Sequence, residues 1–422
     1  MEEQMGHVVK SPYYAFSWGK WKQYAGSQGC IPLNTLKCIS FDRLAPGEPP
    51  PPPPSPPPPP VPTPKQVPVQ AKQPEKAPAN KPAAPAPPRD AESVENPPTF
   101  DLLDVPIAMK NMGWPVSAKL AAKWFSSPKH IYNNDPNSEQ PIDSTIIALD
   151  WCLRFGSVRA KYNELISRKI YNDAAKTLLK EKLAPIFKKG FQGSINLRIN
   201  TTPYTNNLRK FHIDWQFQRV DISNYDTLTS SLGMTDLTGA LANFGIYVAI
   251  GNVEVGGNRY YQYNQIERTK TYCIDAQVKV THIYVYVKDN YSFNDPEGNS
   301  QYLGHWNEKG MVLTTGGIFS ELINGNGIRT DFGNSPETRT TLHWNYLFDK
   351  PLDKPIDKRS GIFRKFRKQD VYWPVYNRTY MQWREQHGRG GDFMIYSKPK
   401  LMKLNVPIEI DIGTICRQSE KM

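Results

Sequence analysis

The sequence predicts an α+β fold: a helical section followed by a mainly antiparallel sheet, preceded by a disordered proline-rich linker. Between residues 114 and 188, apolar side chains recur at helical spacing, and after Gly190 they occupy alternate positions up to residue 287. Helices and strands therefore occupy separate parts of the chain, which is typical of α+β proteins. The prolines at 49–60, interrupted only by Ser55, can join neither a helix interior nor a central strand.

The proline-rich segment divides the chain into three parts. These are a short aromatic-rich head at 1–48, a linker at 49–98 and an α+β body at 99–422. Because proline fixes φ, the linker should adopt polyproline II, a semi-rigid spacer that extends about 3.1 Å per residue. We interpret it as a tether that holds the head away from the body. A ligand for aromatic-groove domains and a solvated linker without a partner are the alternatives.

Three helices are predicted at the start of the body. The first runs from Trp114 to Phe125, and Pro115 suits its first turn. The other two are 142–154 and 169–188. A later helical stretch, Tyr376–Gln386, should end at Gly390-Gly391 and lead into a strand at Phe393–Tyr396.

Strands are predicted where the apolar period changes to two. The most apolar stretch, 237–253, contains three glycines, which favour a short helix, a turn and a buried strand over a membrane helix. The predicted strands are Ser194–Thr201, Lys210–Val220, Gly245–Ile250, Arg259–Ile266 and Tyr272–Val287.

Three residues are candidates for acid-base chemistry. In the strand predicted at Lys210–Val220, His212 and Asp214 share one face, where a carboxylate could orient an imidazole. An ordinary solvated sheet face is the alternative. His305, between a glycine and a tryptophan, is a candidate base, and a structural histidine is its alternative. The oxygen-rich loop at Asp289–Asn299 lacks EF-hand spacing, so no metal site is predicted, and no pattern specifies a cofactor.

The chain carries a formal net charge of +12, which favours anionic partners such as nucleic acid, acidic protein or anionic lipid. The densest basic cluster lies at 359–368, where two phenylalanines are interleaved with cations. Such a segment can grip phosphates, stack on bases or lie on anionic lipid, and a solvated face is the alternative. The predicted anion-binding residues are Arg359, Arg364, Lys365, Arg367 and Lys368.

Five scattered cysteines without a CxxC pair indicate neither a disulfide framework nor a zinc site. A reducing compartment is therefore the default expectation. No signal peptide and no apolar run of about 18 residues is visible, so no transmembrane helix is predicted. We expect the protein to be cytoplasmic in the producing cell, with export that needs no signal peptide as a further hypothesis.

The tetrapeptide Gly390-Gly391-Asp392-Phe393 is similar to the signature of cyclic-dinucleotide cyclases. That signature needs a second acidic residue before the phenylalanine, and this chain lacks it. We interpret the glycines as the end of a helix. Walker loops, dinucleotide fingerprints, nucleophile elbows and zinc-protease helices are absent from the sequence.

Three segments together resemble a bacterial family catalogued as domain of unknown function 6402. They are Trp114–Pro128, the stretch from Val285 to Asn307, and Gly390–Ser397. The resemblance covers roughly residues 100–415 and none of the head. It carries over no activity and no catalytic residues. Members of the family tend to be encoded beside type VI secretion components, so the resemblance implies a secretion-linked role.

Three functions follow as hypotheses. The first is an antibacterial effector whose head docks on the secretion apparatus through Tyr13, Tyr14, Trp18 and Trp21. The second is a non-enzymatic adaptor that binds a secretion cargo or spike component. The third is a nucleic-acid-binding protein that uses the cluster at 359–368. Under the first two, the expected partners are a secretion-apparatus protein, a chaperone or an immunity protein.

Overall fold

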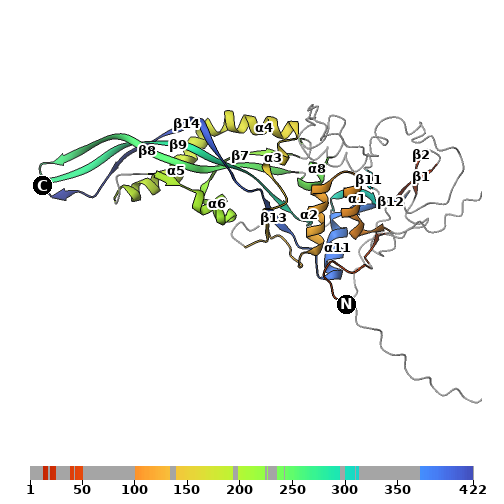
Figure 1. Cartoon of the computed structure of the whole chain (residues 1–422). Helices are drawn as coiled ribbons and strands as arrows, with labels where there is room; N and C mark the ends of the chain where they lie inside the picture. Colours follow the sequence, from red (N-terminus) through yellow and green to blue (C-terminus); the bar gives the residue numbers. More distant parts are fainter. Residues whose placement is uncertain are drawn as a thin grey trace, which may run out of the picture.

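The computed structural model confirms the α+β class, with helices gathered around a mostly antiparallel sheet (Figure 1). Among the residues that the structure describes, no helix is long and apolar enough to cross a membrane. The structure describes residues 13–17, 20–24, 39–41, 43–50, 100–133, 139–192, 198–223, 226, 235–241, 243–294, 300–308, 310–312 and 371–421.

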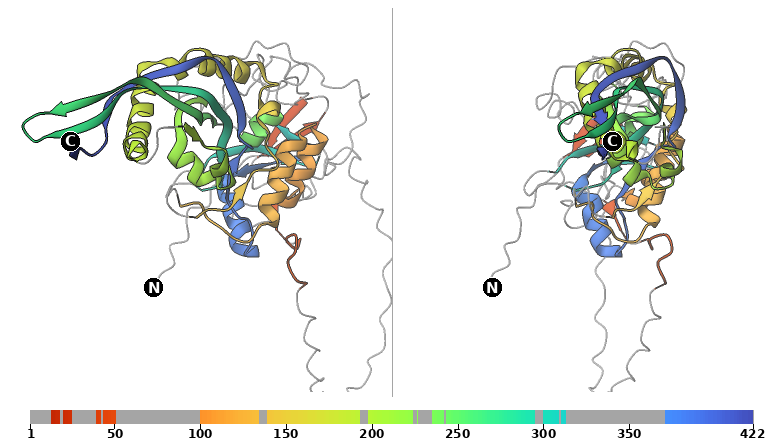
Figure 2. Two further views of the ribbon diagram at one scale, coloured as in Figure 1. Left: turned by 60° about the vertical axis from the view of Figure 1, so that its left-hand side comes forward. Right: turned by 90° about the vertical axis from the view of Figure 1, so that its left-hand side faces the viewer.

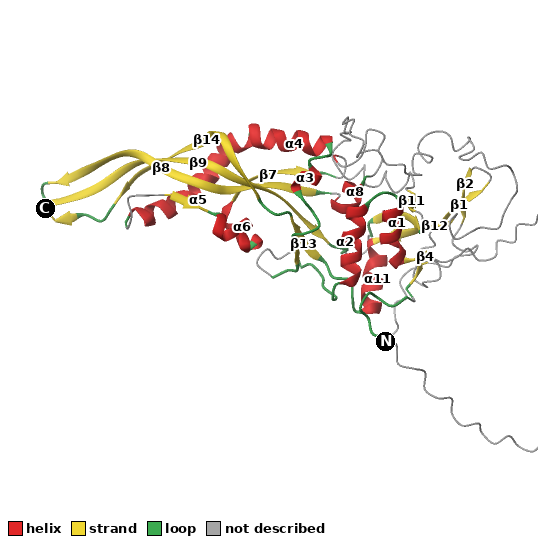
Figure 3. Cartoon of the chain, viewed as in Figure 1, coloured by secondary structure: helices red, strands yellow, loops and turns green. Residues whose placement is uncertain are grey.

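All the described α-helices belong to the body (Figure 3). Short 3₁₀ turns accompany them at Leu102–Asp104, Lys169–Tyr171 and Thr202–Asn206. The α-helices are α1 Val105–Asn111, α2 Pro115–Ser126, α3 Leu149–Cys152, α4 Gly156–Ser167, α5 Asp173–Phe191, α6 Leu208–Trp215, α8 Asp236–Leu241 and α11 Asn377–His387.

The larger sheet has eight strands, in the order β5-β13-β9-β8-β6, with β14 and β15 also paired to β9 and β7 paired to β8. Among the described strands of this sheet, only β5 and β13 pair in parallel. The strands are β5 Ile142–Asp143, β6 Arg198–Asn200, β7 Gln216–Ile222, β8 Phe244–Asn264, β9 Thr269–Tyr291, β13 Phe393–Tyr396, β14 Lys400–Cys416 and β15 Glu420–Lys421.

A second sheet has five strands, in the order β11-β10-β12-β1-β2. Two further strands, β3 Ile39–Ser40 and β4 Phe100–Asp101, form a parallel pair. The strands of the five-stranded sheet are β1 Tyr13–Ser17, β2 Lys20–Tyr24, β10 Tyr302–Asn307, β11 Gly310–Val312 and β12 Val371–Tyr376.

The outer halves of β8, β9 and β14 leave the body as a long curled ribbon, which we call the arm (Figures 1 and 2). It comprises residues 255–280 and 408–421. Between Gly245 and Val253 every residue of β8 except Tyr247 and Asn252 is buried, whereas in the arm most side chains of this strand are exposed. The outer part of β8 is therefore held mainly by strand pairing, whereas the isoleucines of β14 in the arm, such as Ile408 and Ile415, are buried in the core. The C terminus lies at the tip of the arm (Figure 1).

Several predicted elements are confirmed. Helix α2 begins at Pro115, and α5 covers most of the predicted 169–188 segment. The stretch 237–253 contains all of α8 but its first residue and the buried start of β8. Helix α11 and strand β13 also follow the prediction, although the helix ends at Gly388, whose φ of 59° suits glycine.

The strand predicted at Lys210–Val220 is wrong over its first half, because residues up to Trp215 form helix α6. The side chain of Asn207 accepts a hydrogen bond from the Lys210 amide and so starts the helix. Phe211 and Trp215, four residues apart, are both buried on one helical face, whereas Ile213 is 48% exposed. In so short a stretch, Phe211 and Trp215 fit both the helical period of 3.6 and the strand period of two. Their packing against the sheet favours the helix.

The helix predicted at 142–154 is also wrong, because only Leu149–Cys152 is helical there. The carboxylate of Asp143 accepts hydrogen bonds from the amides of Thr145 and Ile146, and this turn follows directly after β5. The strands predicted at 245–250 and 259–266 are one continuous strand, β8. At Gly257, where φ is 140°, a Cβ would lie 1.9 Å from the Asp275 carbonyl oxygen, so the arm needs glycine there.

The segment before the proline tract packs on the body. Phe41 and Ala45 are buried in the same core as α1 and α2. Arg43 pairs with Asp104, and Glu48 pairs with His387 at 2.9 Å. Residues 39–41 and 43–50 therefore pack as part of the body, so the full chain is the appropriate form for experiments. Residues 51–99, which include most of the linker predicted at 49–98, lie outside the described part of the structure.

Candidate functional site

Helix α6 places His212 against three tyrosines of the larger sheet. The imidazole Nδ1 is hydrogen-bonded to the Tyr286 hydroxyl at 2.8 Å. The ring lies edge-on to Tyr247 and Tyr396, with centroid distances of 4.8 and 5.9 Å. We call these four residues the His212 cluster.

Strand register explains why the three tyrosines meet. Tyr247 of β8 and Tyr286 of β9 are cross-strand partners, and their rings stack at 6.0 Å. Tyr396 of β13 pairs with Lys288, two residues beyond Tyr286 and therefore on the same face. Gly245 leaves room for the Tyr247 ring, because a Cβ there would lie 2.4 Å from it.

The electrostatics of the cluster keep its members uncharged at neutral pH. Burial, reinforced by the positive charges of Lys288, Lys182 and Arg219, lowers the pKa of His212 to about 4. Burial raises the pKa of Tyr286 well above its usual value. A neutral imidazole beside a neutral phenol can orient a polar group, but it holds no proton to release at pH 7.

Asp214 does not orient His212. In a helix, residues two apart point about 200° away from each other, so the shared face expected for a strand is lost. Asp214 pairs instead with Lys210 at 3.2 Å. The group that hydrogen-bonds the His212 imidazole is the Tyr286 hydroxyl, where a carboxylate was expected.

The third catalytic candidate, His305, belongs to the other sheet. Its backbone pairs with Val312 of β11 and Pro374 of β12. Helix α6, which carries His212 and Asp214, packs on the eight-stranded sheet instead. The side chain of His305 lies outside the described part of the structure, so its catalytic role stays a prediction.

Two other predicted sets also lie outside the described residues. They are the basic cluster at 359–368 and the side chains of Tyr13, Tyr14, Trp18 and Trp21. Strands β1 and β2 are placed, and β1 pairs with β12 of the body. Within the described ranges, no group of three or more His, Cys, Asp or Glu residues is arranged to hold a metal ion.

The pKa of His212 gives the cluster a testable effect on stability. The unfolded imidazole titrates near 6.5 and the folded one near 4, so the unfolded state binds more protons between these values. We expect the free energy of unfolding of the full chain to fall by about 2 kcal/mol as pH drops from 7 to 4 through this residue, after allowance for solvent screening. Urea titrations across this range, compared for the wild type and His212→Asn, measure it.

The substitution His282→Asn is the matched control, because this histidine lies on β9 outside the His212 cluster and its ring Nδ1 is hydrogen-bonded to the Thr281 hydroxyl at 3.0 Å. It should leave the pH dependence unchanged. If His212→Asn and the wild type lose the same stability between pH 7 and 4, the proposed burial of a neutral imidazole is wrong.

A second polar centre is fully buried around Asp392. Its carboxylate accepts hydrogen bonds from Arg384 Nη2 at 2.6 Å, Trp124 Nε1 at 2.9 Å and Asn294 Nδ2 at 2.9 Å, and from the amide of Tyr132 at 3.1 Å. Arg384 and Asp392 are 1% and 0% exposed. We call this centre the Asp392 clamp, because it ties α2, α11 and the segments near 132 and 294 to one carboxylate.

Glycine is needed at both positions before Asp392. A Cβ at Gly390 would lie 2.5 Å from the Trp124 ring, and one at Gly391 would lie 2.3 Å from the Pro128 carbonyl oxygen. The two glycines therefore let the chain pass directly over α2 and deliver Asp392 to its donors. The cyclase-like tetrapeptide is thus a structural device, since both carboxylate oxygens are already occupied by protein donors.

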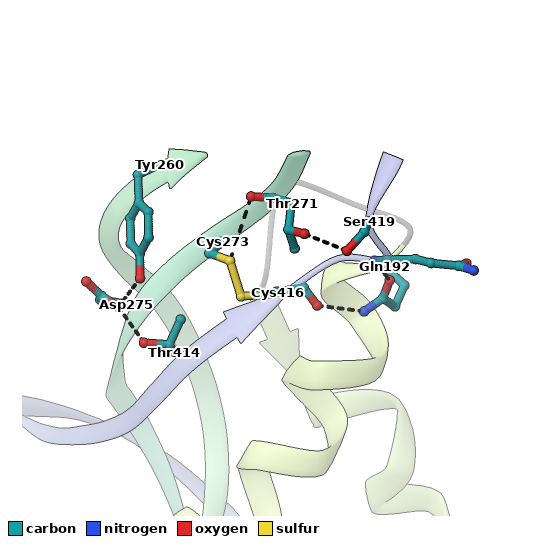
Figure 4. Close-up of a disulfide and its surroundings, with 9 residues drawn as sticks. Gln192, Tyr260, Thr271, Cys273, Asp275, Thr414, Cys416 and Ser419 are labelled. Atoms are coloured by element: carbon teal, nitrogen blue, oxygen red, sulfur yellow. Dashed lines mark hydrogen bonds between the residues drawn. A yellow bond between two sulfur atoms is a disulfide. The ribbon is translucent and has the colours of Figure 1, made fainter. Parts of the chain in front are cut away.

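The arm contains a disulfide between Cys273 of β9 and Cys416 of β14 (Figure 4). The two cysteines are cross-strand partners with a Cα–Cα distance of 4.1 Å, and they are 143 residues apart in sequence. The prediction that the cysteines indicate no disulfide is therefore wrong. The spacing of the cysteines in the sequence does not reveal this pair, because the pairing depends on the register of β14 against β9.

Residues 100–412 match the family of unknown function DUF6402. The chain belongs to the DUF6402 family. No curated protein and no solved structure matches it. The DUF6402 match includes α1 to α11, most of the arm and the Asp392 clamp, and it begins at the β4 strand that follows the linker.

The three segments that carried the DUF6402 resemblance converge on the Asp392 clamp. Trp124 comes from the first, Asn294 from the second and Asp392 from the third. Ser397, at the end of the third, exchanges two hydrogen bonds with the Val287 backbone, each of 2.9 Å. In this member of DUF6402, the three segments therefore hold the body together.

Proposed function

We propose that the chain is an antibacterial effector of a type VI secretion system and that it works in an oxidising compartment, the periplasm of the recipient cell. The observation that carries this proposal is the Cys273–Cys416 disulfide. Disulfides persist in the bacterial periplasm and are rare in the cytosol, where thiols are kept reduced. A pair of cysteines placed to form a disulfide in the arm is what we expect of a protein that leaves the cytoplasm.

The disulfide favours the effector over the adaptor. An adaptor that loads cargo acts in the cytoplasm of the producing cell, where Cys273 and Cys416 would remain thiols. An effector passes through an oxidising compartment on its way to its target. The link to type VI secretion is the one implied by the DUF6402 resemblance, and an immunity protein is then the expected partner.

The test is growth of a susceptible bacterium that expresses the full chain, in parallel in the cytoplasm and, with an added signal peptide, in the periplasm. We expect loss of viable cells only when the chain is in the periplasm. The Cys273→Ser/Cys416→Ser variant should lose much of this toxicity, whereas Cys152→Ala, at the buried free cysteine, should retain it.

Two results would contradict the proposal. Killing from the cytoplasm alone would point to nucleic acid or a metabolite as the target. No killing from either compartment, with the folded protein present in both, would favour the adaptor.

A further inference from the structure

The far end of the arm exposes apolar side chains. We call residues 259–272 and 416–421 the arm tip. Tyr261 is 49% exposed, Tyr263 63% and Ile266 96%, and the last of these lies in the turn between β8 and β9. Large apolar groups at the apex of a projecting ribbon contribute nothing to a core, so their exposure needs another explanation.

The aromatic side chains of the tip form a continuous row on one face. Phe191, at the end of α5, stacks on Tyr272 at 5.7 Å, and Tyr272 contacts its cross-strand partner Tyr261 at 5.0 Å. Tyr261 lies 6.3 Å from Tyr263, which leads to the turn. The row thus runs from the body to the apex of the arm.

The opposite face of the arm differs in character. There the Tyr260 hydroxyl and the Thr414 hydroxyl both donate to Asp275, at 3.1 and 2.6 Å (Figure 4). The Cys273–Cys416 disulfide lies beside them and fixes β14 to β9 at the inner end of the tip. The arm tip is therefore two-sided, with an aromatic face and a polar face held in fixed register.

Cations accompany the aromatic face. Lys270 Nζ lies 5.6 Å from the centre of the Tyr261 ring, and the Arg417 guanidinium lies 5.4 Å from that of Tyr272. The tip carries five basic side chains against two acidic ones, Glu267 and Glu420. The basic residues are Arg259, Arg268, Lys270, Arg417 and Lys421.

The arm tip combines the three kinds of side chain that proteins place at a membrane interface, aliphatic, tyrosine and basic. Ile266 and Arg268 lie in the turn at the apex. Tyr263 follows, with Lys270 as its cross-strand partner, and Tyr261, Arg259 and Arg417 lie further back. In proteins at membrane interfaces, aliphatic residues reach the acyl boundary, tyrosines lie at the headgroup level, and Lys and Arg contact lipid phosphates.

We propose that the arm tip docks on an anionic lipid surface, with Ile266 and Tyr263 entering the interface and the basic residues binding lipid phosphates. Each Lys or Arg near such a surface adds attraction, and the net positive charge of the tip complements it. Glu267 at the apex keeps the docking shallow. This activity goes beyond the proposed function, since it requires neither toxicity nor type VI secretion.

A platform for single-stranded nucleic acid is the other ligand that exposed tyrosines and cations could serve. That use places aromatic rings under bases and has no role for an almost fully exposed isoleucine at the apex. The exposure of Ile266 therefore favours a lipid surface as the ligand. Nucleic-acid binding is an alternative result of the binding experiment.

The experiment is flotation of the full chain with vesicles of phosphatidylcholine alone or mixed with phosphatidylglycerol. We expect binding to the anionic vesicles, weakened by salt and by Lys270→Gln. Ile266→Asp should reduce the partition coefficient by about tenfold or more, since it removes a buried apolar side chain and adds a negative charge. Val406→Asp is the matched control, because Val406 is 65% exposed on β14 at the base of the arm, and this variant should bind as the wild type does.

Three results would overturn the proposal. One is the absence of binding to anionic vesicles by the folded wild type, and another is equal loss of binding in Ile266→Asp and Val406→Asp. The third is binding of a labelled oligothymidylate that Tyr263→Ser abolishes and Ile266→Asp does not, because this result would assign the row to nucleic acid. Circular dichroism and urea unfolding of each variant establish that it is folded.

Discussion

We expect the substitution Asp392→Ala to lower the free energy of unfolding of the full chain by about 3–5 kcal/mol. The change leaves the Arg384 guanidinium buried, at 1% exposure, without its carboxylate partner. It also removes the acceptor of the Trp124 indole N–H and of the Asn294 side chain. A buried charge and buried donors without partners are among the most destabilising consequences that a single substitution can have.

Two further variants give this prediction its controls. Asp392→Asn keeps the shape and one acceptor oxygen, so its loss of stability should be smaller than that of Asp392→Ala. Asp150→Ala breaks an ion pair with Lys400 whose members are 70% and 60% exposed, and it should change the free energy by less than about 1 kcal/mol. Equal effects of Asp392→Ala and Asp150→Ala in urea titrations would show that the clamp does not hold the body together.

Reduction of the Cys273–Cys416 disulfide should lower the free energy of unfolding by about 3–4 kcal/mol. The bond closes a loop of 143 residues, so its loss greatly enlarges the set of unfolded conformations. The effect should centre on the arm, where the bond links β14 to β9. Urea unfolding with and without reductant measures it.

The Cys273→Ser/Cys416→Ser variant is the control for reduction. It should match the reduced wild type and should not respond to reductant. A wild type whose unfolding curve is the same in oxidising and reducing buffer would contradict the prediction.

Local signals in the sequence predicted those helices whose ends are marked by proline or glycine. Pro115 begins α2, and the glycines after α11 separate this helix from strand β13. The segment at 208–215 could not be predicted in this way, because its aromatic residues fit both a helix and a strand. The choice depends on the packing of Phe211 against Tyr284 and Tyr286 of a distant strand.

The sites depend still more on long-range contacts. Asp392 stood out in the sequence as part of a short motif, but its partner Trp124 is 268 residues away. His212 was a candidate from the sequence, yet its partner, Tyr286, could be found only once α6 was placed on the sheet. The disulfide required the register of β14 against β9, which no local pattern specifies.

The most direct test of the proposed function is the redox state of Cys273 and Cys416 in cells. Thiols of the full chain would be trapped by acid quenching and alkylation in producing cells and, after contact, in the periplasmic fraction of recipient cells. We predict free thiols in the producer cytoplasm and a closed disulfide in the recipient. A chain that is never found in recipients, or whose cysteines remain reduced there, would contradict the account of an exported effector that works in an oxidising compartment.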